Sequence, residues 1–360
     1  MTYLDYQATT PLAPEAFDAM LPWLRDGHAN PHSAHAGGRR ARAAVEAARD
    51  AVAALFPAGG ALSFTSGATE ALNWAIKGTV GDIVTIATEH AAVLDTVAAE
   101  RRRGRAVAIL PVGEDGQVDL DAAQKAIVPG TGLVAAMLVN NEIGVIQPIT
   151  ALADMAHAVG SRLLCDAVQG YGRVDIPPAC DLVAISAHKV HGPKGIGALW
   201  VRDGSPPSPL MHGGGQEALG RSGTLSPALC AGFGVAARLM RDRRGEDAAH
   251  VDRLYALATA RLSHWVVNGS GADRYRGNLN LRRDGLDVAR LMSDLRDIAF
   301  SAGSACASGS GRPSHVLRAI GLSDAQARSS IRLGFGRYTT EAELLSALDR
   351  IDAAAKAQRS

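Results

Sequence analysis

Lys189 is the residue whose sequence context best suits covalent chemistry. The chain has only five lysines, and Lys189 ends an apolar, strand-like run that starts at Asp181 and leads into the glycine-rich segment 191–197. Burial at a strand end lowers the pKa of a lysine, and the neutral amine can then form a Schiff base with a carbonyl compound. Taken alone, the segment fits an ordinary solvated lysine better, so the prediction depends on other motifs.

Two further segments carry groups that suit a charged ligand. Residues 63–70 indicate a strand, a glycine turn and the start of a helix, where backbone N–H groups and hydroxyls can hold a phosphate. An ordinary helix N-cap at Ser66 or Thr69 explains the same residues. Asp166 follows the apolar run 163–165, and a buried carboxylate needs a partner such as a protonated pyridine nitrogen. Lysine, phosphate cradle and acid together are the groups that pyridoxal 5'-phosphate requires.

The elements that must position these residues alternate in type along the chain. Short runs rich in Val, Ile and Leu alternate with alanine-rich helical segments, which predicts an α/β fold with a mostly parallel sheet. Ligands bind at the carboxyl ends of such strands. From Gly232 a helical pattern extends to about Trp265, and a smaller second domain is expected to begin near Val251, whereas 203–215 is expected to be a loop. The expected strands are 62–65, 82–87, 106–110, 133–139, 162–166, 181–186 and 198–201.

Composition excludes several classes of protein. Hydrophobic residues make up 47% and charged residues 20% of the 360 residues, so the chain can bury a core and is not disordered. A net charge of +1 offers no field for nucleic acid or an anionic membrane. The N-terminus lacks a signal-peptide pattern, no apolar run is long enough to span a bilayer, and the four cysteines have no disulfide-framework spacing. We therefore expect a cytoplasmic enzyme that binds neither nucleic acid nor a membrane.

Nine short motifs occur in order along the chain. They are LDYQATTP at 4–11, NPHSAH at 30–35, TSGATE at 65–70, TEH at 88–90, VNNEIG at 139–144, DAVQ at 166–169, HK at 188–189, RSGT at 221–224 and SAGSAC at 301–306. Together they resemble cysteine desulfurases of the NifS/IscS type, which belong to the class V aminotransferase family. The resemblance implies the fold type I of pyridoxal-phosphate-dependent transferases. It implies a large cofactor-binding domain at 15–250 and a small domain formed by 1–14 and 251–360.

The resemblance also implies a role for each matching residue. Lys189 would carry pyridoxal 5'-phosphate as a Schiff base and, once released, would move protons. Asp166 would pair with the pyridine nitrogen, Gln169 with the phenolic oxygen, and His90 would stack on the ring and relay protons. Within one subunit, phosphate contacts are expected from Ala68, Thr69, Ser186 and His188. The resemblance also implies a homodimer, in which Thr224 reaches the phosphate site of the opposite subunit.

Substrate contacts follow from the same matches. Asn141 is expected near the cofactor and the substrate, with the adjacent Asn140 as the alternative assignment, and Asn30 is expected at the substrate. Arg332 lies in a strand-like stretch, and its fork geometry suits the carboxylate of an amino acid.

Cys306 is the residue that the resemblance identifies as the sulfur acceptor. It lies in a stretch of glycine and serine with too little apolar content for a core, whereas Cys165 and Cys230 stand beside leucines and are expected to be inert. Its thiolate would attack the sulfur of bound L-cysteine, retain that sulfur as a persulfide, and leave L-alanine. An acceptor protein such as an iron–sulfur scaffold would then take the sulfur, for cluster assembly or other thiolation.

Three alternatives compete with this interpretation. A selenocysteine lyase or another class V lyase would use the same cofactor site. A catalytically silent binding subunit is disfavoured because it has no need for both Lys189 and Cys306. A metal site built from His188, His191 and His212 is disfavoured because the neighbouring lysine and glycines have better explanations, and no metal is expected.

Overall fold

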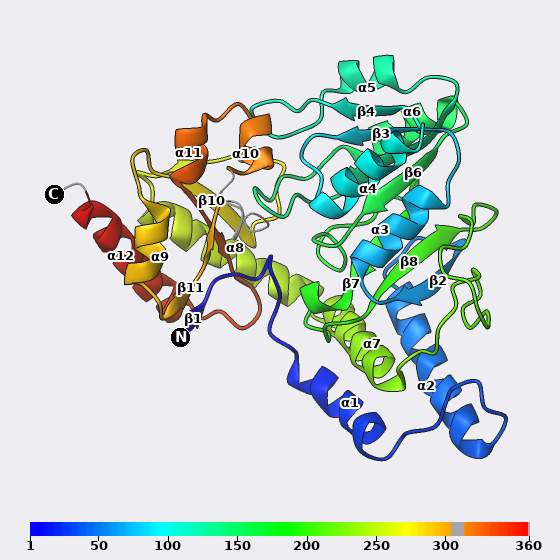
Figure 1. Cartoon of the computed structure of the whole chain (residues 1–360). Coiled ribbons are helices and arrows are strands. Elements are labelled where there is room, and N and C mark those ends of the chain that lie inside the picture. Colours follow the sequence, from blue (N-terminus) through cyan, green and yellow to red (C-terminus); the bar gives the residue numbers. More distant parts are fainter. Residues whose placement is uncertain (304–312, 359–360) are drawn as a thin grey trace.

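A seven-stranded sheet forms the frame of the larger part of the molecule (Figure 1). In the computed structural model, which describes residues 1–303 and 313–358, its strand order is β2-β8-β7-β6-β5-β3-β4. All neighbours pair in parallel except β8, which is antiparallel to β2 and β7. The predicted α/β fold is confirmed, and each predicted strand is present to within two residues at either end. The bounds are β2 Gly60–Thr65, β3 Asp82–Ile86, β4 Val107–Leu110, β5 Thr131–Met137, β6 Arg162–Asp166, β7 Leu182–Ser186 and β8 Gly197–Arg202.

Helices cover both faces of this sheet because its strands are apolar on both sides. Val134 and Ala136 of β5 pack into a core shared with α2 (Ala36–Ala53), α5 (Leu120–Ala126), α6 (Ile149–Ala158) and α7 (Pro227–Asp242). Leu133 and Ala135 of the same strand face the other way, toward α3 (Ala68–Lys77) and α4 (Ala91–Arg102). Helix α1 (Pro14–Arg25) packs against α7. The alternation along β5 thus places one helical layer on each face.

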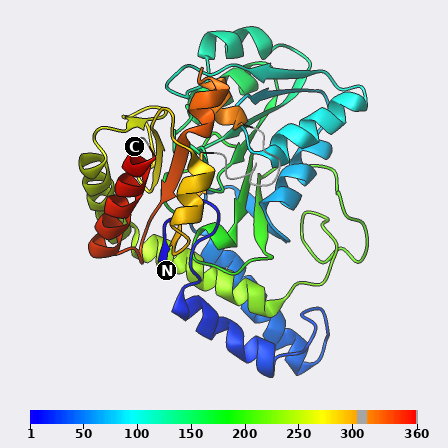
Figure 2. The same ribbon diagram turned by 60° about the vertical axis from the view of Figure 1, so that its left-hand side comes forward.

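A second core lies beside the first (Figures 1 and 2). A four-stranded antiparallel sheet in the order β12-β13-β10-β9 and a two-stranded parallel pair, β1 and β11, form it together with several helices. The strands are β1 Thr2–Tyr3, β9 Val266–Val267, β10 Asn278–Arg282, β11 Ile298–Ala299, β12 Ser301–Ala302 and β13 Ser330–Gly334. Its helices are α8 Arg244–Arg261, α9 Val288–Asp294 and α12 Glu341–Ala357, whereas α10 His315–Ala319 and α11 Asp324–Arg328 pack with Ile143 and Val145 in a smaller cluster.

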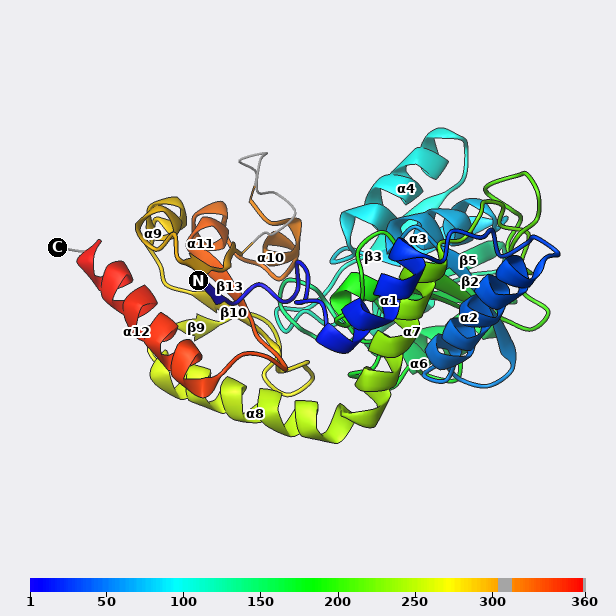
Figure 3. The same ribbon diagram turned by 90° about the horizontal axis from the view of Figure 1, so that it is seen from below.

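Helix α8 connects the two cores (Figure 3). The helical pattern expected from Gly232 onward forms two helices that meet at Arg243, and α8 then crosses to the smaller part. Leu254 and Ala258 of α8 belong to the second core, as does Leu4 from the start of the chain. On this basis we propose the division into 15–250 and 1–14 plus 251–360.

The carboxyl ends of the central strands meet at one edge of the large sheet. Strand β6 ends at Asp166, β7 ends at Ser186, and β2 leads through a turn at Gly67 into α3. The predicted loop after β8 is confirmed, since no helix or strand is present from 203 to 226. No helix in the described part of the chain is long and apolar enough to cross a membrane.

Candidate active site

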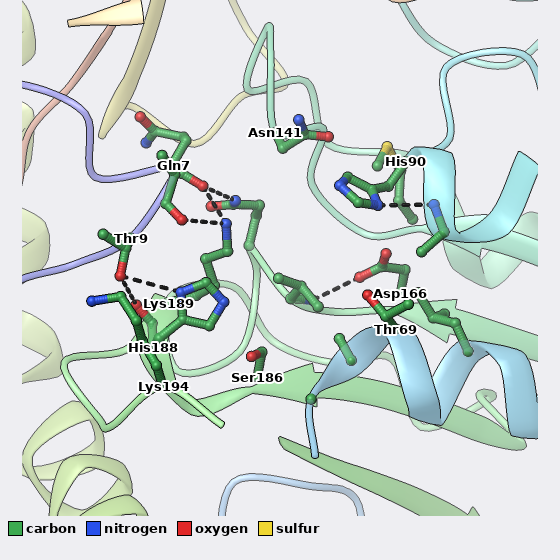
Figure 4. A pocket seen from close by; sticks show the side chains of 18 of the residues that line it. Gln7, Thr9, Thr69, His90, Asn141, Asp166, Ser186, His188, Lys189 and Lys194 are labelled. Carbon is green, nitrogen blue, oxygen red and sulfur yellow. Dashed lines mark hydrogen bonds between the residues drawn. The ribbon is translucent and has the colours of Figure 1, made fainter. Parts of the chain in front are cut away.

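A cavity of about 620 Å³ opens at this edge of the sheet, within the size range of small-molecule sites. Strand ends of the large sheet, the starts of α3 and α4, the N-terminal segment and β13 contribute to its wall. Figure 4 shows Lys189 and His188 on one side of the space and Asp166, His90 and Thr69 on the other. The predicted site residues that line the cavity are Ala68, Thr69, His90, Asn141, Asp166, Gln169, Ser186, His188, Lys189 and Arg332.

Lys189 ends a short 3-10 turn (Ala187–Lys189) that directly follows β7. Its Nζ donates hydrogen bonds to the main-chain carbonyls of Gln7 at 2.5 Å and Ala8 at 2.9 Å. Its own main-chain carbonyl accepts a hydrogen bond from the guanidinium of Arg173. The lysine is therefore held at both ends, with its amine at the wall of the cavity.

Asp166 is a buried carboxylate at the end of β6, with 6% of its surface exposed. One of its oxygens accepts a hydrogen bond from the Val168 N–H at 3.0 Å. Burial raises the pKa of Asp166, while that hydrogen bond and the nearby His90 and Lys189 lower it. A cation placed against this carboxylate would favour its charged form.

His90 is the N-cap of α4. Its Nδ1 accepts a hydrogen bond from the Ala92 N–H at 3.1 Å, so the neutral ring carries its proton on Nε2. Burial lowers the pKa of His90, which favours that neutral form. The cap fixes the ring at the cavity wall, and Figure 4 shows it above Asp166.

The start of α3 is suited to an anion. Its N-cap is Gly67, which has no side chain to accept hydrogen bonds from the N–H groups of the first turn, and Gly67, Ala68 and Thr69 line the cavity. Ser186 and His188 approach the same cavity from β7 and the turn after it. His188 is bonded through Nδ1 to the Thr9 hydroxyl at 3.2 Å, and burial lowers its pKa to about 4.

Asn141, and not Asn140, lines the cavity. The side chain of Asn140 is used in its own loop, where it donates to the Thr88 carbonyl and accepts from the Glu142 and Ile143 N–H groups. The geometry therefore favours the predicted assignment over its alternative.

Comparison with known proteins extends over nearly the whole chain. The family model for aminotransferase class-V matches residues 2–346. The chain belongs to the class-V aminotransferase family. It is 42% identical to the cysteine desulfurase IscS of Rickettsia bellii (strain OSU 85-389) over 95% of this chain and 88% of that protein. A solved NifS-like protein aligns with a TM-score of 0.90 at 30% identity over 98% of both chains. The structure described as SspA in complex with cysteine aligns with a TM-score of 0.84 at 34% identity, covering 94% of this chain and all of the other.

These matches confirm the resemblance to cysteine desulfurases of the NifS/IscS type and the fold type I of this class-V chain. The family implies pyridoxal 5'-phosphate, and the residues present fit that group. An amine, a buried acid and an uncapped helix start surround one cavity of suitable size. These are the groups needed for the aldehyde, the ring nitrogen and the phosphate of the cofactor.

Three predicted residues of this class-V enzyme are not brought to the cavity by the described structure. Asn30 is exposed in the loop between α1 and α2, where its side chain accepts a hydrogen bond from the His32 N–H. Thr224 is exposed in the loop before α7. Cys306 lies outside the described residues. The roles of all three stay predictions.

The N-terminal segment is the part of the site that the sequence prediction missed. Gln7, Ala8 and Thr9 line the cavity, and the Gln7 carbonyl also accepts a hydrogen bond from Gln169 Nε2 at 3.0 Å. The LDYQATTP motif at 4–11 was the available signal, but hydrogen bonds accepted by main-chain carbonyls do not depend on residue type. Cys165, Cys180 and Cys230 are buried, as expected for inert cysteines.

Proposed function

We propose that this chain is a cysteine desulfurase that takes the sulfur of L-cysteine onto Cys306 and releases L-alanine. The observation that carries the proposal is that Lys189, Asp166, the start of α3 and Arg332 all line one cavity. They provide sites for a carbonyl, a ring nitrogen, a phosphate and an amino-acid carboxylate. The 42% identity to a cysteine desulfurase supports L-cysteine as the amino acid.

Pyridoxal 5'-phosphate, when bound, supplies an electron sink for the electron pair left on the substrate Cα after proton loss. We assign Lys189 as its covalent anchor through a Schiff base and Asp166 as the partner of its ring nitrogen. The phosphate contacts assigned to Ala68, Thr69, Ser186 and His188 rest on their place at the start of α3 and the end of β7. The neutral His188 ring carries only one N–H group. Because Nδ1 is hydrogen-bonded to the Thr9 hydroxyl, a contact of His188 with the phosphate would have to be made through Nε2.

Proton transfer is assigned to Lys189 and His90. Once the substrate amine has displaced Lys189, its Nζ stays beside the cavity and can take the proton from the substrate Cα. His90 lines the cavity and, with Nδ1 used in its cap to α4, can donate a hydrogen bond through its Nε2 proton, while its role as a proton relay rests on the resemblance. Burial keeps His90 uncharged near neutral pH, which lets the ring stack on a flat partner without a desolvated charge.

Substrate orientation is assigned to Arg332 and Asn141. Arg332 is 1% exposed, lines the cavity and presents a guanidinium suited to a carboxylate. The main-chain carbonyl of Asn141 accepts a hydrogen bond from Arg332 Nη1 at 3.0 Å, so the Asn141 side chain stays available at the cavity. Together they would fix the orientation of the amino acid in the cavity. Asn30 keeps its proposed substrate role from the sequence alone.

The sulfur-transfer step is assigned to Cys306 on sequence alone. The Cys306 thiolate attacks the sulfur of the bound substrate, a sulfur–sulfur bond forms, and the carbon–sulfur bond breaks with its electron pair going to Cβ. Protonation of that carbon gives the methyl group of L-alanine. The persulfide on Cys306 then passes its outer sulfur to an acceptor protein, for which an iron–sulfur scaffold is our proposal.

We also infer a homodimer in which Thr224 completes the phosphate site of the opposite subunit. Thr224 is exposed and lies outside the cavity of its own chain, which supports a role across an interface. Mixed dimers of Lys189→Ala and Thr224→Ala chains should recover part of the activity that each variant lacks. Mixed dimers without recovery would contradict shared sites.

The test of the proposed function is the product balance with L-cysteine. Protein loaded with pyridoxal 5'-phosphate should produce alanine and, with a thiol reductant present, an equal amount of sulfide. Lys189→Ala should produce neither, whereas Lys125→Ala, on α5 outside the cavity, should match the wild type. Formation of pyruvate or ammonia in place of alanine would contradict the proposal. The same assay with selenocysteine in place of cysteine distinguishes a cysteine desulfurase from a selenocysteine lyase, which would release alanine faster from selenocysteine.

A further inference from the structure

Arg332 is a charged group that the fold has removed almost completely from water. It lies in the middle of β13, opposite Asn280 of β10 on one side and Ser301 of β12 on the other. Only 1% of its side chain is exposed. A buried guanidinium is costly unless a counter-charge and hydrogen bonds accompany it. The only carboxylate within ion-pair distance, among the residues described, is that of Asp5, with 2.7 Å between Arg332 Nη2 and Asp5 Oδ1.

The contacts around the guanidinium set its plane. Asp5 Oδ1 accepts from Arg332 Nη2 and also from the Ser301 hydroxyl at 2.8 Å. Arg332 Nη2 reaches the same hydroxyl at 3.2 Å, so the three side chains form a closed triangle. The main-chain carbonyl of Asn141 accepts a hydrogen bond from Arg332 Nη1 at 3.0 Å. Two different nitrogens are therefore fixed from two directions, which prevents rotation of the planar group.

One edge of the guanidinium stays available. Arg332 Nε has no hydrogen-bond partner among the described residues, and Nη1 carries a second proton beyond its contact with Asn141, whereas Nη2 already makes two contacts. A carboxylate needs two parallel N–H groups in one plane, so its recognition depends on the plane that Asp5 and Asn141 impose.

Asp5 is itself held in place by the small domain. Its neighbour Leu4 donates to the Ala299 carbonyl and accepts from the Gly334 N–H, both at 2.7 Å. The main-chain carbonyl of Asp5 accepts hydrogen bonds from the Tyr3 hydroxyl at 3.2 Å and the Ala8 N–H at 3.0 Å. The carboxylate is thus preorganised by a backbone that bonds to both neighbouring strands. It does not have to be ordered at the moment the substrate binds.

We propose that Asp5 is a positioning residue that orients Arg332 and thereby determines the preference of the site for amines that carry an α-carboxylate. The inference rests on the proposed function, because it needs an amino acid in the cavity. Asp5 touches neither substrate nor cofactor and acts through Arg332. Removing its charge should weaken the carboxylate contact and leave the binding of the amine unaffected.

The test compares two ligands that differ only in the carboxylate. The protein loaded with pyridoxal 5'-phosphate is titrated with L-alanine and with ethylamine, and binding is followed through the visible spectrum of the cofactor. Asp5→Asn, which preserves size but removes the charge, should weaken L-alanine binding by about tenfold or more, a loss of about 1.4 kcal/mol. Ethylamine binding should stay within about twofold of the wild type. Asp297→Asn, which removes the exposed ion pair with Arg350, is the matched control and should change neither ligand.

The outcomes separate the inference from the proposed function. Unchanged L-alanine binding in Asp5→Asn, or an equal loss of both ligands, overturns the positioning role. A wild type that does not prefer L-alanine to ethylamine contradicts the proposed function instead. If Asp5→Asn does not fold, Asp5→Glu retains the charge, and Ser301→Ala removes one corner of the triangle without a charge. The preference for L-alanine over ethylamine should be larger in Asp5→Glu than in Ser301→Ala, and the reverse order overturns the inference.

Discussion

The amine of Lys189 donates a hydrogen bond to the main-chain carbonyl of Ala8, 181 residues earlier in the chain, at 2.9 Å. The same short segment holds Arg332 through Asp5 and His188 through the Thr9 hydroxyl. The segment from Asp5 to Thr9 therefore contacts the proposed cofactor anchor, a proposed phosphate contact and the proposed carboxylate contact. Because the segment joins groups from both parts of the molecule, it fixes their spacing across the cavity.

The covalent anchor can be tested by chemical trapping. Borohydride should fix pyridoxal 5'-phosphate irreversibly to the wild type and to Lys125→Ala, but not to Lys189→Ala, since a reducible carbon–nitrogen bond requires that amine. Peptide mapping should place the label on the peptide that contains Lys189. A label on Lys194, which also lines the cavity, would overturn the assignment.

Glu70 connects the proposed phosphate site to the loop that carries Thr224. Burial acts to raise its pKa, but hydrogen bonds from Arg221 and from the Ser66 N–H lower it, so the carboxylate is charged. Glu70→Gln should weaken the pairing with Arg221 and loosen the turn before α3. We expect the dissociation constant for pyridoxal 5'-phosphate, measured by equilibrium dialysis, to rise severalfold. Glu46→Gln, at an exposed position on α2, should leave it unchanged.

Glu217 should matter for folding more than for the reaction. Its side chain is fully buried, pairs with Arg49 at 2.8 Å and accepts the Phe64 N–H at 2.8 Å, which ties the loop after β8 to β2. Glu217→Ala leaves the partly buried Arg49 without this partner and should lower the free energy of unfolding by about 3–5 kcal/mol.

Glu46 provides the comparison, since it pairs with the same Arg49 from an exposed position. Glu46→Ala should cost about 1 kcal/mol or less. Equal losses in urea unfolding for the two variants would contradict the importance of burial at Glu217.

His191 should make stability depend on pH. It is 3% exposed, and burial, with Arg337 and Arg173 nearby, lowers its pKa to about 3 from the usual 6.5. Between these values the unfolded chain binds a proton that the folded chain does not, so stability falls as the pH drops below 6.5. From pH 7 to pH 5 this histidine should lower the free energy of unfolding by about 2 kcal/mol.

His191→Asn removes this titration and suits the backbone, because φ at this position is 66° and asparagine tolerates that region. Its unfolding free energy should fall less between pH 7 and pH 5 than that of the wild type or of the exposed-site variant His28→Asn. An identical pH dependence in all three proteins would show that His191 has the same pKa in the folded and the unfolded chain, which contradicts this prediction.

The large sheet could be predicted because its strands are short apolar runs separated by helices. The observed β6 has the predicted bounds 162–166, and the acid at its end faces the cavity, since the strand is buried up to that residue. The prediction for β5 began and ended two residues late, because the apolar run continues through Leu138 and Val139 after the chain leaves the sheet. Residue type alone does not show where a ladder of hydrogen bonds stops.

The links across the cavity could not be predicted from local sequence. Nothing around Asp5 indicates Arg332, which lies 327 residues later, and the pair exists only because the segment after β1 bonds to β13 and packs into the same core. Gln7 makes a second link of this kind. Its side chain does bond to the Gly277 carbonyl, but its main-chain carbonyl meets Lys189 and Gln169, a contact independent of side-chain identity.

The most direct measurement of the central claim is turnover of L-cysteine by Cys306→Ala. Because the change removes the nucleophile and leaves Lys189, Asp166 and Arg332 in place, the variant should retain its visible cofactor spectrum and still bind L-cysteine. Alanine release should fall by orders of magnitude, and the persulfide detected by mass spectrometry on the Cys306 peptide of the wild type should be absent. Alanine formation by Cys306→Ala at the wild-type rate would contradict the account and indicate a lyase that needs no protein thiol.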